Sequence, residues 1–552
     1  MLAHRSRSGA RLGVAAVLVP MLCAAACCVA AEPHLAKHGS ATQLLVHGRP
    51  ILVLGGELSN SAASSARYMT PHWPRLKAMH LNTVLAPVSW ELIEPQEGHY
   101  EWQSVDELIS GARAQDLHLV LLWFGAWKNS MSTYVPAWVK RDALRFPRAK
   151  GPEGRSLDIL SALAPATRDA DARAFAALLA HLRAQDYERN TVLMVQVENE
   201  IGMLTAARDL SAEATRRFGE PVPEALLRVL GSSATDTPLH RLWQEHGARA
   251  SGGWTQVFGE GDAAAEVFTA WHYARYVETL VKAGKAAYAL PMYVNAALNR
   301  PNKHPGEYPS GGPLPHLFEV WKAGAPTLDL LAPDIYFQNF AEIATRYRAA
   351  HNPLFIPEAN YADRGEVAPN VFYAIGKLDA IGVAPFSVDS IDDPPTNRLA
   401  QAYGILSELA PAILANQGLN RMSAFRPIVH EDGTLVSTPV SERIGDYEFT
   451  VSFVDPQSPA ETQALTNHGG LIVQVGAEEY LVAGQGMIVS FSAAGDPGSS
   501  VGIDSDWEGH FDEDGAWIAG RLLNGDQTHQ GRHVRLAPEA FQIQRLKLYR
   551  FR

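Results

Sequence analysis

The stretch that decides the fold is residues 191–202, which read TVLMVQVENEIG. Its first seven residues are nearly all apolar, as expected for a strand buried on both faces of a parallel sheet. The run stops at Glu198, Asn199 and Glu200. Strand alternation places Glu198 and Glu200 on one side and Asn199 opposite, unless the strand has already ended. Such polar groups are costly to bury unless they are paired or used, so the segment predicts a functional strand end.

Seven further apolar runs of this kind alternate with helical patterns. Between two of them, Phe175, Leu178, Leu179 and Leu182 have the spacing of one helix face. The alternation predicts an α/β fold, a (β/α)₈ TIM barrel over residues 40–417, with a large insertion at about 203–270. A doubly wound sheet is the alternative, but it normally has a glycine-rich phosphate turn after its first strand. The seven runs are 51–57, 82–89, 117–124, 290–295, 328–336, 353–358 and 382–388.

The pattern changes after residue 417. Tyr447, Phe449, Val451 and Phe453 alternate with polar residues, which is typical of a half-buried strand. Short β-rich runs continue to residue 548 and include a hairpin signal at 471–482. Residues 418–552 are therefore predicted to form a C-terminal antiparallel β-sandwich domain.

The N-terminus has the composition of an export signal. Arg5, Arg7 and Arg11 precede an apolar, Ala-rich run that ends near residue 31. Residues 1–31 are predicted to be a signal peptide, so the protein is expected in the periplasm or outside the cell. The alternatives are a membrane anchor and a lipoprotein with its lipid on Cys27. The same segment contains all three cysteines of the chain, Cys23, Cys27 and Cys28. The mature protein is therefore expected to have no disulfide.

Composition narrows the class of protein. The chain has 552 residues, is 47% hydrophobic and 19% charged, and has a net charge of −12. These values are ordinary for a globular protein of two or three domains. A net acidic chain without a basic block is not expected to bind nucleic acid, and no membrane span is expected in the mature chain. The oligomeric state is left open.

A second apolar run ends at a carboxylate on the predicted seventh strand, where residues 353–360 read PLFIPEAN and contain Glu358. In a barrel, the C-terminal strand ends face the active site, so carboxylates after strands four and seven can face each other. Glycoside cleavage needs two such groups. One protonates the leaving oxygen, and the other attacks the anomeric carbon or, at larger separation, activates water.

Other residues near strand ends are candidates for binding sugar. Trp90 and Trp127 are expected to stack on a sugar face, and Asn129 to bind a hydroxyl group. Glu57, at the end of the first strand, is a further candidate, the alternative being a structural ion pair below the barrel mouth. No metal-ligand motif is present among the 20 histidines, so no metal and no cofactor are predicted.

These features resemble the retaining (β/α)₈ glycosidases. Within that clan, residues 196–202 (QVENEIG) look like the acid/base segment of glycoside hydrolase family 35, the β-galactosidases. Residues 90–95 (WELIEP) are similar to the family's segment after strand two. Family 42 β-galactosidases of the same clan are a near alternative.

The resemblance implies roles for four residues. Glu200 would be the acid/base and Glu358 the nucleophile. Asn199 would bind the sugar hydroxyl next to the reacting carbon, and Tyr336 would orient the nucleophile, as a tyrosine does after strand six in the clan. The chain departs from the family at Ile201, where an aromatic residue is usual, and around residues 123–129, where the family has a proline-rich loop with an acidic sugar ligand.

The sequence therefore predicts an exo-acting retaining β-galactosidase. It would hydrolyse terminal β-galactosyl residues of oligo- or polysaccharides by a double displacement that uses two carboxylates. The alternatives are another retaining glycosidase of the clan, such as an arabinosidase or an endo-glycanase, and a non-catalytic glycan-binding barrel.

Overall fold

The computed structural model describes residue 1 and residues 32–232, 236–349, 352–496 and 498–552. The predicted signal peptide, apart from Met1, and the three cysteines lie outside these ranges. Among the described helices, none has both the length and the apolar character needed to cross a bilayer.

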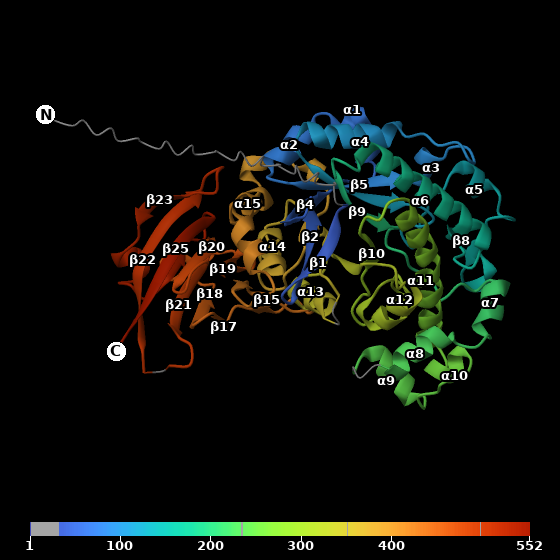
Figure 1. Cartoon of the computed structure of the whole chain (residues 1–552). Helices are drawn as coiled ribbons and strands as arrows, with labels where there is room; N and C mark the ends of the chain where they lie inside the picture. The colour runs from blue at the N-terminus through green and yellow to red at the C-terminus, as the bar shows by residue number, and fades with distance from the viewer. Residues whose placement is uncertain (2–31, 233–235, 350–351, 497) are drawn as a thin grey trace.

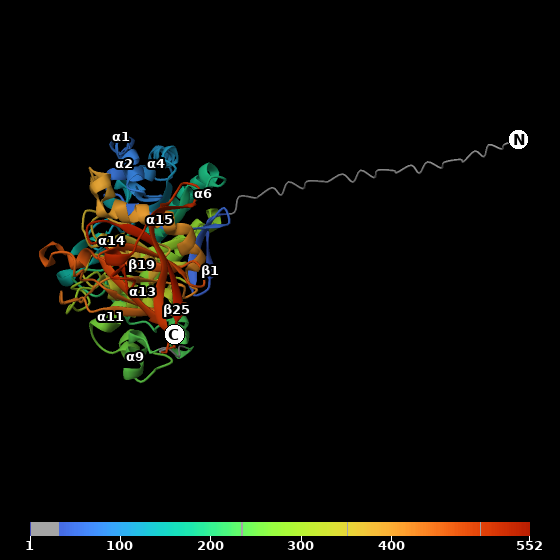
Figure 2. The same cartoon turned by 90° about the vertical axis from the view of Figure 1, so that its left-hand side faces the viewer.

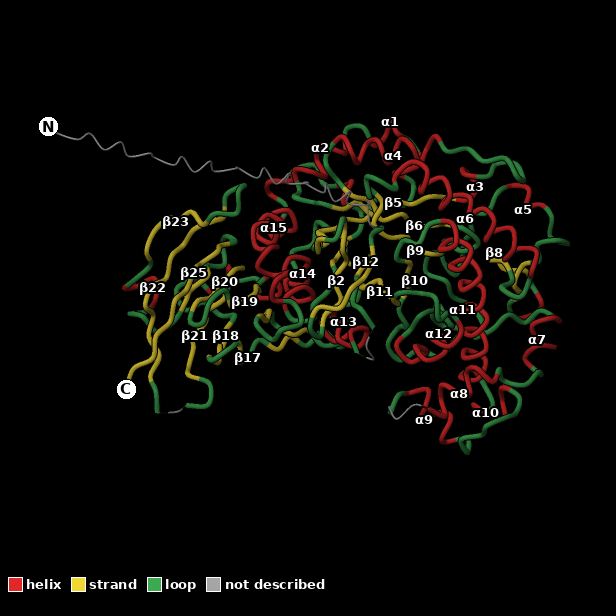
Figure 3. Tube along the Cα trace, in the orientation of Figure 1, coloured by secondary structure: helices red, strands yellow, loops and turns green. Residues whose placement is uncertain are grey.

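Eight parallel strands close into a barrel, as predicted (Figure 3). All eight predicted runs contribute a strand, because nearly every residue in them is buried. In the order of the chain these strands are β4 (Val53–Glu57), β5 (Thr83–Ser89), β6 (His118–Phe124), β9 (Val192–Val197), β10 (Met292–Ala297), β11 (Leu330–Ile335), β12 (Ile356–Ala359) and β13 (Gly382–Pro385).

A small antiparallel sheet precedes the barrel and was not predicted. It consists of β1 (His34–His38), β2 (Ala41–Val46) and β3 (Arg49–Ile51). Leu44 and Val46 of β2 belong to the same buried cluster as Val53 and Leu193, which lie at the N-terminal ends of barrel strands. The sheet therefore covers the bottom of the barrel and leaves the carboxyl ends of the strands for the site.

Helices surround the barrel, and a cluster of short helices extends from it. The segment between β9 and β10 contains α7 to α11, and α8, α9 and α10 lie at the end of the molecule far from the C-terminal sheets (Figure 1). A short hairpin, β7 (Arg148–Lys150) and β8 (Ser156–Leu160), follows β6. The helices are α1 (Ala66–Met69), α2 (His72–Ala78), α3 (Trp90–Ile93), α4 (Gln103–Ala114), α5 (Ala137–Arg141), α6 (Pro165–Asp186), α7 (Ala212–Phe218), α8 (Glu224–Ser232), α9 (Pro238–Glu245), α10 (Trp254–Phe258), α11 (Asp262–Ala287), α12 (Phe318–Gly324), α13 (Phe340–Arg348), α14 (Val367–Gly376) and α15 (Arg398–Asn416).

The C-terminal part forms an antiparallel β-sandwich, as predicted. One sheet has six strands in the order β14-β19-β20-β25-β22-β23, and the other has four in the order β17-β18-β21-β24. Phe449 and Val489 from the smaller sheet share a buried core with Val482 and Leu546 from the larger one. The strands are β14 (Met422–Phe425), β15 (Ile428–Val429), β16 (Leu435–Val436), β17 (Val440–Ile444), β18 (Tyr447–Ser452), β19 (Gly469–Gln474), β20 (Glu479–Gln485), β21 (Met487–Ala493), β22 (Ser500–Phe511), β23 (Trp517–Leu522), β24 (Val534–Leu536) and β25 (Gln542–Phe551).

Helix α14 joins the two parts of the molecule. It lies between the barrel strands and the larger sheet of the sandwich, which faces the viewer in Figure 2. A Cβ atom on Gly376 would lie 2.8 Å from the Cβ of Ala424 in β14 and 3.2 Å from that of Leu471 in β19. The backbone of α14 therefore packs directly on the sandwich, and the contact admits only glycine at this position without a shift.

Candidate active site

Glu200 and Glu358 meet at the carboxyl end of the barrel. Glu358 is the third residue of β12, and Glu200 follows the end of β9 by three residues. Oxygen atoms of their carboxyl groups lie within 4.8 Å of one another, together with an oxygen of Asp334. The two groups predicted to act together are therefore at a distance that fits direct attack, for which carboxyl groups lie about 5–5.5 Å apart.

The chain after β9 does not continue as a strand. Glu198 has a φ of 62° and Glu200 a φ of 45°, both in the left-handed region that is uncommon outside glycine. These turns send Glu198 away from Glu200, so the placement of the two carboxylates on one side by alternation is wrong here. The strand has already ended at Val197, and the strained backbone is what aims Glu200 at the mouth.

Glu198 pairs with Asp171, a residue of α6 that sequence reasoning missed. Glu198 accepts hydrogen bonds from the backbone N–H of Ala126 at 3.2 Å and of Trp127 at 2.7 Å. Asp171 accepts them from Trp123 Nε1 at 2.8 Å and Tyr276 Oη at 2.7 Å. Burial, and then the charge of Asp171, raise the pKa of Glu198 well above its usual value. The role of the two acids is to fasten the loop after β6 to the segment that carries Glu200.

Asn295 of β10 holds the backbone of Glu200 in place. Its Oδ1 accepts a hydrogen bond from Glu200 N at 2.9 Å, and its Nδ2 donates to Asp334 Oδ2 at 2.7 Å and to Asn199 Oδ1 at 2.9 Å. Asn199 is 1% exposed, and its Nδ2 donates to the carbonyl oxygen of Lys128 at 2.8 Å. The structure thus places Asn199 under the site as part of its framework, and the sugar contact predicted for it stays a prediction.

Four carboxyl groups converge at this end of the barrel. Glu57, at the end of β4, is 2% exposed, and it forms a hydrogen bond with Glu358 rather than an ion pair. Burial, and then the charge of Glu358, raise the pKa of Glu57 and of Asp334 well above their usual values. The same two causes raise the pKa of Glu200 to about 7, with Lys128 and a hydrogen bond from Asp334 acting against the rise. Glu200 is therefore poised as an acid near neutral pH.

Tyr336, one residue after β11, donates a hydrogen bond from its hydroxyl group to Glu358 Oε1. Its side chain is 37% exposed, and its ring contacts that of Tyr361, with the ring centroids 6.0 Å apart. This is the position predicted for a tyrosine that orients the nucleophile.

The two tryptophans expected to stack on sugar are both fully buried. Trp90 donates its Nε1 hydrogen to Glu94 at 2.7 Å and packs edge-on against Trp138. Trp127 packs edge-on against Tyr273 and Tyr276. Neither ring offers a face to a sugar in this structure, because both turn into the helix layer and support the mouth from behind.

Asn129 lies in the half-buried loop after β6. Its Oδ1 accepts hydrogen bonds from Met131 N at 2.9 Å and Ser132 Oγ at 3.1 Å, which closes its own turn. Its Nδ2 has no hydrogen bond to any described residue, so a sugar hydroxyl could still be bound there. Lys128, next to it, places its Nζ 5.3 Å from the centre of the Phe124 ring.

Glu200, Asp334 and Glu358 form the one group of ligand-type side chains within the described ranges that is compact enough to hold a metal ion. Hard cations prefer six or more oxygen ligands, and one oxygen from each of three carboxyl groups falls short of that number. The prediction of no metal therefore stays a prediction, and it is tested below.

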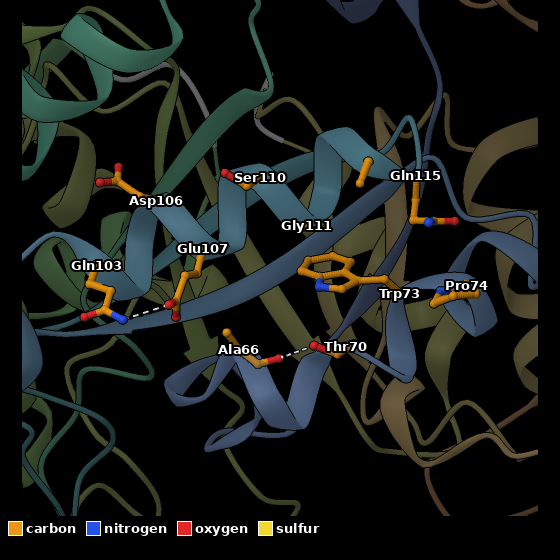
Figure 4. A pocket seen from close by; sticks show the side chains of 11 residues that line it. Ala66, Thr70, Trp73, Pro74, Gln103, Asp106, Glu107, Ser110, Gly111 and Gln115 are labelled. Carbon is orange, nitrogen blue, oxygen red and sulfur yellow. Dashed lines mark hydrogen bonds between the residues drawn. The ribbon is translucent and has the colours of Figure 1, made fainter.

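A cavity of about 690 Å³ lies on the outside of the barrel, among α1, α2 and α4 (Figure 4). Trp73 and Pro74 line one side of it, and Gln103 and Glu107 of α4 line the other. It contains none of the predicted site residues.

Comparison with known families gives two matches. Residues 66–244 match a family 42 model described as beta-galactosidase, and residues 399–535 match a domain of unknown function (DUF5597). The first match contains Glu200 and ends before Glu358. No curated protein matches the chain.

Among solved structures, the chain is similar in fold to β-galactosidases from Marinomonas ef1 and Bacillus circulans sp. alkalophilus. The former is 13% identical with a TM-score of 0.44, covering 65% of this chain and 60% of the other. The latter is 15% identical with a TM-score of 0.45, covering 66% and 57%. The catalytic domain of a Paenibacillus polymyxa β-amylase is 11% identical with a TM-score of 0.46, covering 64% and 97%. The chain thus spans less than two thirds of the length of either β-galactosidase.

The family match and the closed barrel agree on the class of protein. Residues 66–244 match a glycoside hydrolase model and lie within the closed barrel, which is the fold predicted for such an enzyme. The match is to family 42, the near alternative, so the closer resemblance to family 35 is not confirmed.

Proposed function

We propose that the protein is an exo-acting retaining β-galactosidase that removes terminal β-galactosyl residues from oligo- or polysaccharides. The observation that carries the proposal is the approach of the Glu200 and Glu358 carboxyl groups to within 4.8 Å at the ends of barrel strands four and seven. An inverting enzyme would need about 6.5–9.5 Å between them to admit a water molecule.

The reaction takes two steps. A carboxylate oxygen of Glu358 attacks the anomeric carbon while the bond to the leaving oxygen breaks, and that oxygen takes the proton of Glu200. Water then attacks the same carbon from the opposite face, giving its proton to Glu200 and releasing Glu358. The loss of charge at Glu358 in the first step lowers the pKa of Glu200, so the residue that served as acid becomes the base.

One observation supports export as part of this proposal. The N-terminal segment has the composition of a signal peptide. N-terminal sequencing of the secreted or periplasmic protein would test the cleavage near residue 31, and lipid labelling at Cys27 would identify a lipoprotein.

The experiment that tests the activity is a panel of chromogenic β-glycosides with NMR of the first product. Galactoside should be the best substrate, ahead of arabinopyranoside, glucoside and fucoside, and the first sugar released should have the β configuration. Preference for arabinopyranoside would make the protein an arabinosidase, and cleavage of internal bonds of a glycan would make it an endo-glycanase. An α product would exclude the retaining mechanism, and binding without hydrolysis would make the barrel a glycan-binding domain.

A further inference from the structure

Asp334 is a third carboxyl group between the two glutamates, and the mechanism above assigns it no role. It lies on β11 directly in register with Glu358 on β12. It is 3% exposed, and one of its oxygens lies within 4.8 Å of oxygens of both Glu200 and Glu358. A buried carboxyl group at this position would repel both glutamates if all three were ionised.

The two oxygens of Asp334 have different surroundings. Oδ2 accepts a hydrogen bond of 2.7 Å from Asn295 Nδ2. Oδ1 is buried and meets no N–H or hydroxyl donor among the described residues. An ionised carboxylate seeks donors at both oxygens, whereas a protonated one needs an acceptor for its own hydrogen. The carboxyl oxygens of Glu200 and Glu358 that lie within 4.8 Å are the candidate acceptors, and Glu200 is the one that forms a hydrogen bond with Asp334.

We propose that Asp334 is a positioning residue that carries a proton and donates it in a hydrogen bond to Glu200, while Asn295 holds both partners in place. This inference rests on the proposed function. Asn295 accepts from the backbone of Glu200 through one amide atom and donates to Asp334 through the other. The hydrogen bond from Asp334 favours the ionised form of Glu200, which is the form that must act as base in the second step.

The charged and titratable groups around Asp334 agree with a protonated state. Glu57 of β4, Glu200 after β9 and Glu358 of β12 all oppose its ionisation, and Lys128 after β6 favours ionisation less strongly. Tyr293 of β10 also faces this group, and its phenol is neutral. With burial, these neighbours raise the pKa of Asp334 well above its usual value.

The test uses two substitutions, of which only one keeps a hydrogen-bond donor at this position. In Asp334→Asn, the amide oxygen can accept from Asn295 and the amide nitrogen can donate to Glu200, as the protonated acid does. Activity should stay within about threefold of wild type, with an unchanged alkaline limb of the pH profile. In Asp334→Ala the donor is lost, so kcat/KM should fall about tenfold or more and the alkaline limb should move up by about one pH unit. A purely structural defect would lower activity without moving the limb.

A second readout does not depend on turnover. The wild-type minus Asp334→Asn difference infrared spectrum at neutral pH should contain a protonated carboxyl band, whereas the bands of the other buried acids, which both proteins share, should cancel. The matched control is Asp329→Asn, one residue before β11 and at the opposite end of the barrel, where the carboxylate accepts from Met292 N at 2.7 Å and pairs with Lys285. This control should leave the band and the alkaline limb as they are.

Three results would overturn the inference. They are a loss of about 100-fold or more in a folded Asp334→Asn variant, the absence of a protonated carboxyl band from that difference spectrum, and inactivation of wild type by a chelator that a divalent cation reverses. If the band behaves as expected but no β-glycoside is hydrolysed, the protonated Asp334 stands and the proposed function fails.

Discussion

The barrel mouth and the sandwich each bury acidic side chains, and they do so in different ways. In the mouth, Glu57, Asp334 and Glu358 lie beside Glu200, and each is joined to a neighbour by a hydrogen bond. In the sandwich, Asp506 of β22 is fully buried, and neither carboxyl oxygen has a partner among the described residues. Burial, and then the charge of Glu508, raise its pKa to about 7.

The comparison separates two uses of the same chemistry. A buried acid costs free energy wherever it lies. In the barrel mouth, burial raises the pKa of Glu200, so that Glu200 can serve as the acid while Glu358 serves as the nucleophile. Among the described residues, the acid that acts on Asp506 is Glu508, which is partly exposed and pairs with Arg521, so burial there is expected to affect stability alone.

Replacing the nucleophile should have the largest effect. Glu358→Ala should lower kcat on every substrate by about 10⁴-fold or more, because no group remains to form the glycosyl intermediate. Glu366→Ala, in the loop that follows β12, is the matched control and should keep activity. The measurement is the steady-state rate of both variants on aryl galactosides. An active Glu358→Ala variant would show that the acids of the barrel mouth do not serve catalysis as the comparison states.

Replacing the acid should depend on the leaving group. Glu200→Ala should lose about 10²–10⁴-fold on alkyl galactosides, which need protonation, and much less in the first step on activated aryl galactosides. Added azide should restore turnover of the activated substrates and yield a β-galactosyl azide. Equal losses for both leaving groups would contradict the roles given to Glu200 and Glu358.

The effect of pH should be smaller than that of either substitution, and activity should fall as pH rises. Glu200 is active when protonated, and its pKa is raised to about 7 by burial and Glu358. The value of kcat/KM for an alkyl galactoside should therefore hold up to neutral pH and then fall about tenfold for each further pH unit. The measurement is a pH profile of wild type, and a fall that begins near pH 4–5, the ordinary range for Glu, would show that burial does not protect this proton.

The smallest effect is expected in the sandwich. Native Asp506 keeps its proton up to about pH 7, whereas the unfolded chain loses it near pH 4. Stability is therefore lost as pH rises from about 4 to 7 and is not regained above that. Asp506→Asn should add about 1–2 kcal/mol to the free energy of unfolding in alkaline buffer, and less in acid, without changing activity.

Urea unfolding at two pH values would measure this change. Asp504→Asn is the control on the same strand, because Asp504 pairs with Lys547 at the surface and both side chains are about half exposed. If Asp506→Asn instead abolished activity, the sandwich would take part in catalysis and the contrast with the mouth would fail.

The strands of the barrel could be predicted because burial on both faces makes each a nearly continuous apolar run. Strands β22 and β23 could not, since most of their residues are partly or fully exposed and no clear alternation marks them. The sheet β1–β3 was missed for a related reason, as two of its three strands are short and partly exposed.

The two glutamates could be predicted because each follows an apolar strand at a known end of the barrel. Their supports could not, because Asp171, Asn295 and Asp334 come from separate segments that only the fold brings together. The tryptophans show a further limit. An aromatic residue after a strand can turn toward the mouth or toward the helices, and nothing in the local sequence of Trp90 or Trp127 distinguishes the two.

The contact between α14 and the sandwich has a consequence for the order in which the chain is made. Synthesis runs from the N-terminus, and domains generally fold as they emerge. The face of α14 around Gly376 is covered by β14 and β19, which end at Phe425 and Gln474. The barrel is complete at the end of α15, Asn416, about 60 residues before the end of β19. Until those residues have been added, that face of the completed barrel remains open to water and to other nascent chains, so the sandwich closes the barrel as the last step of its maturation.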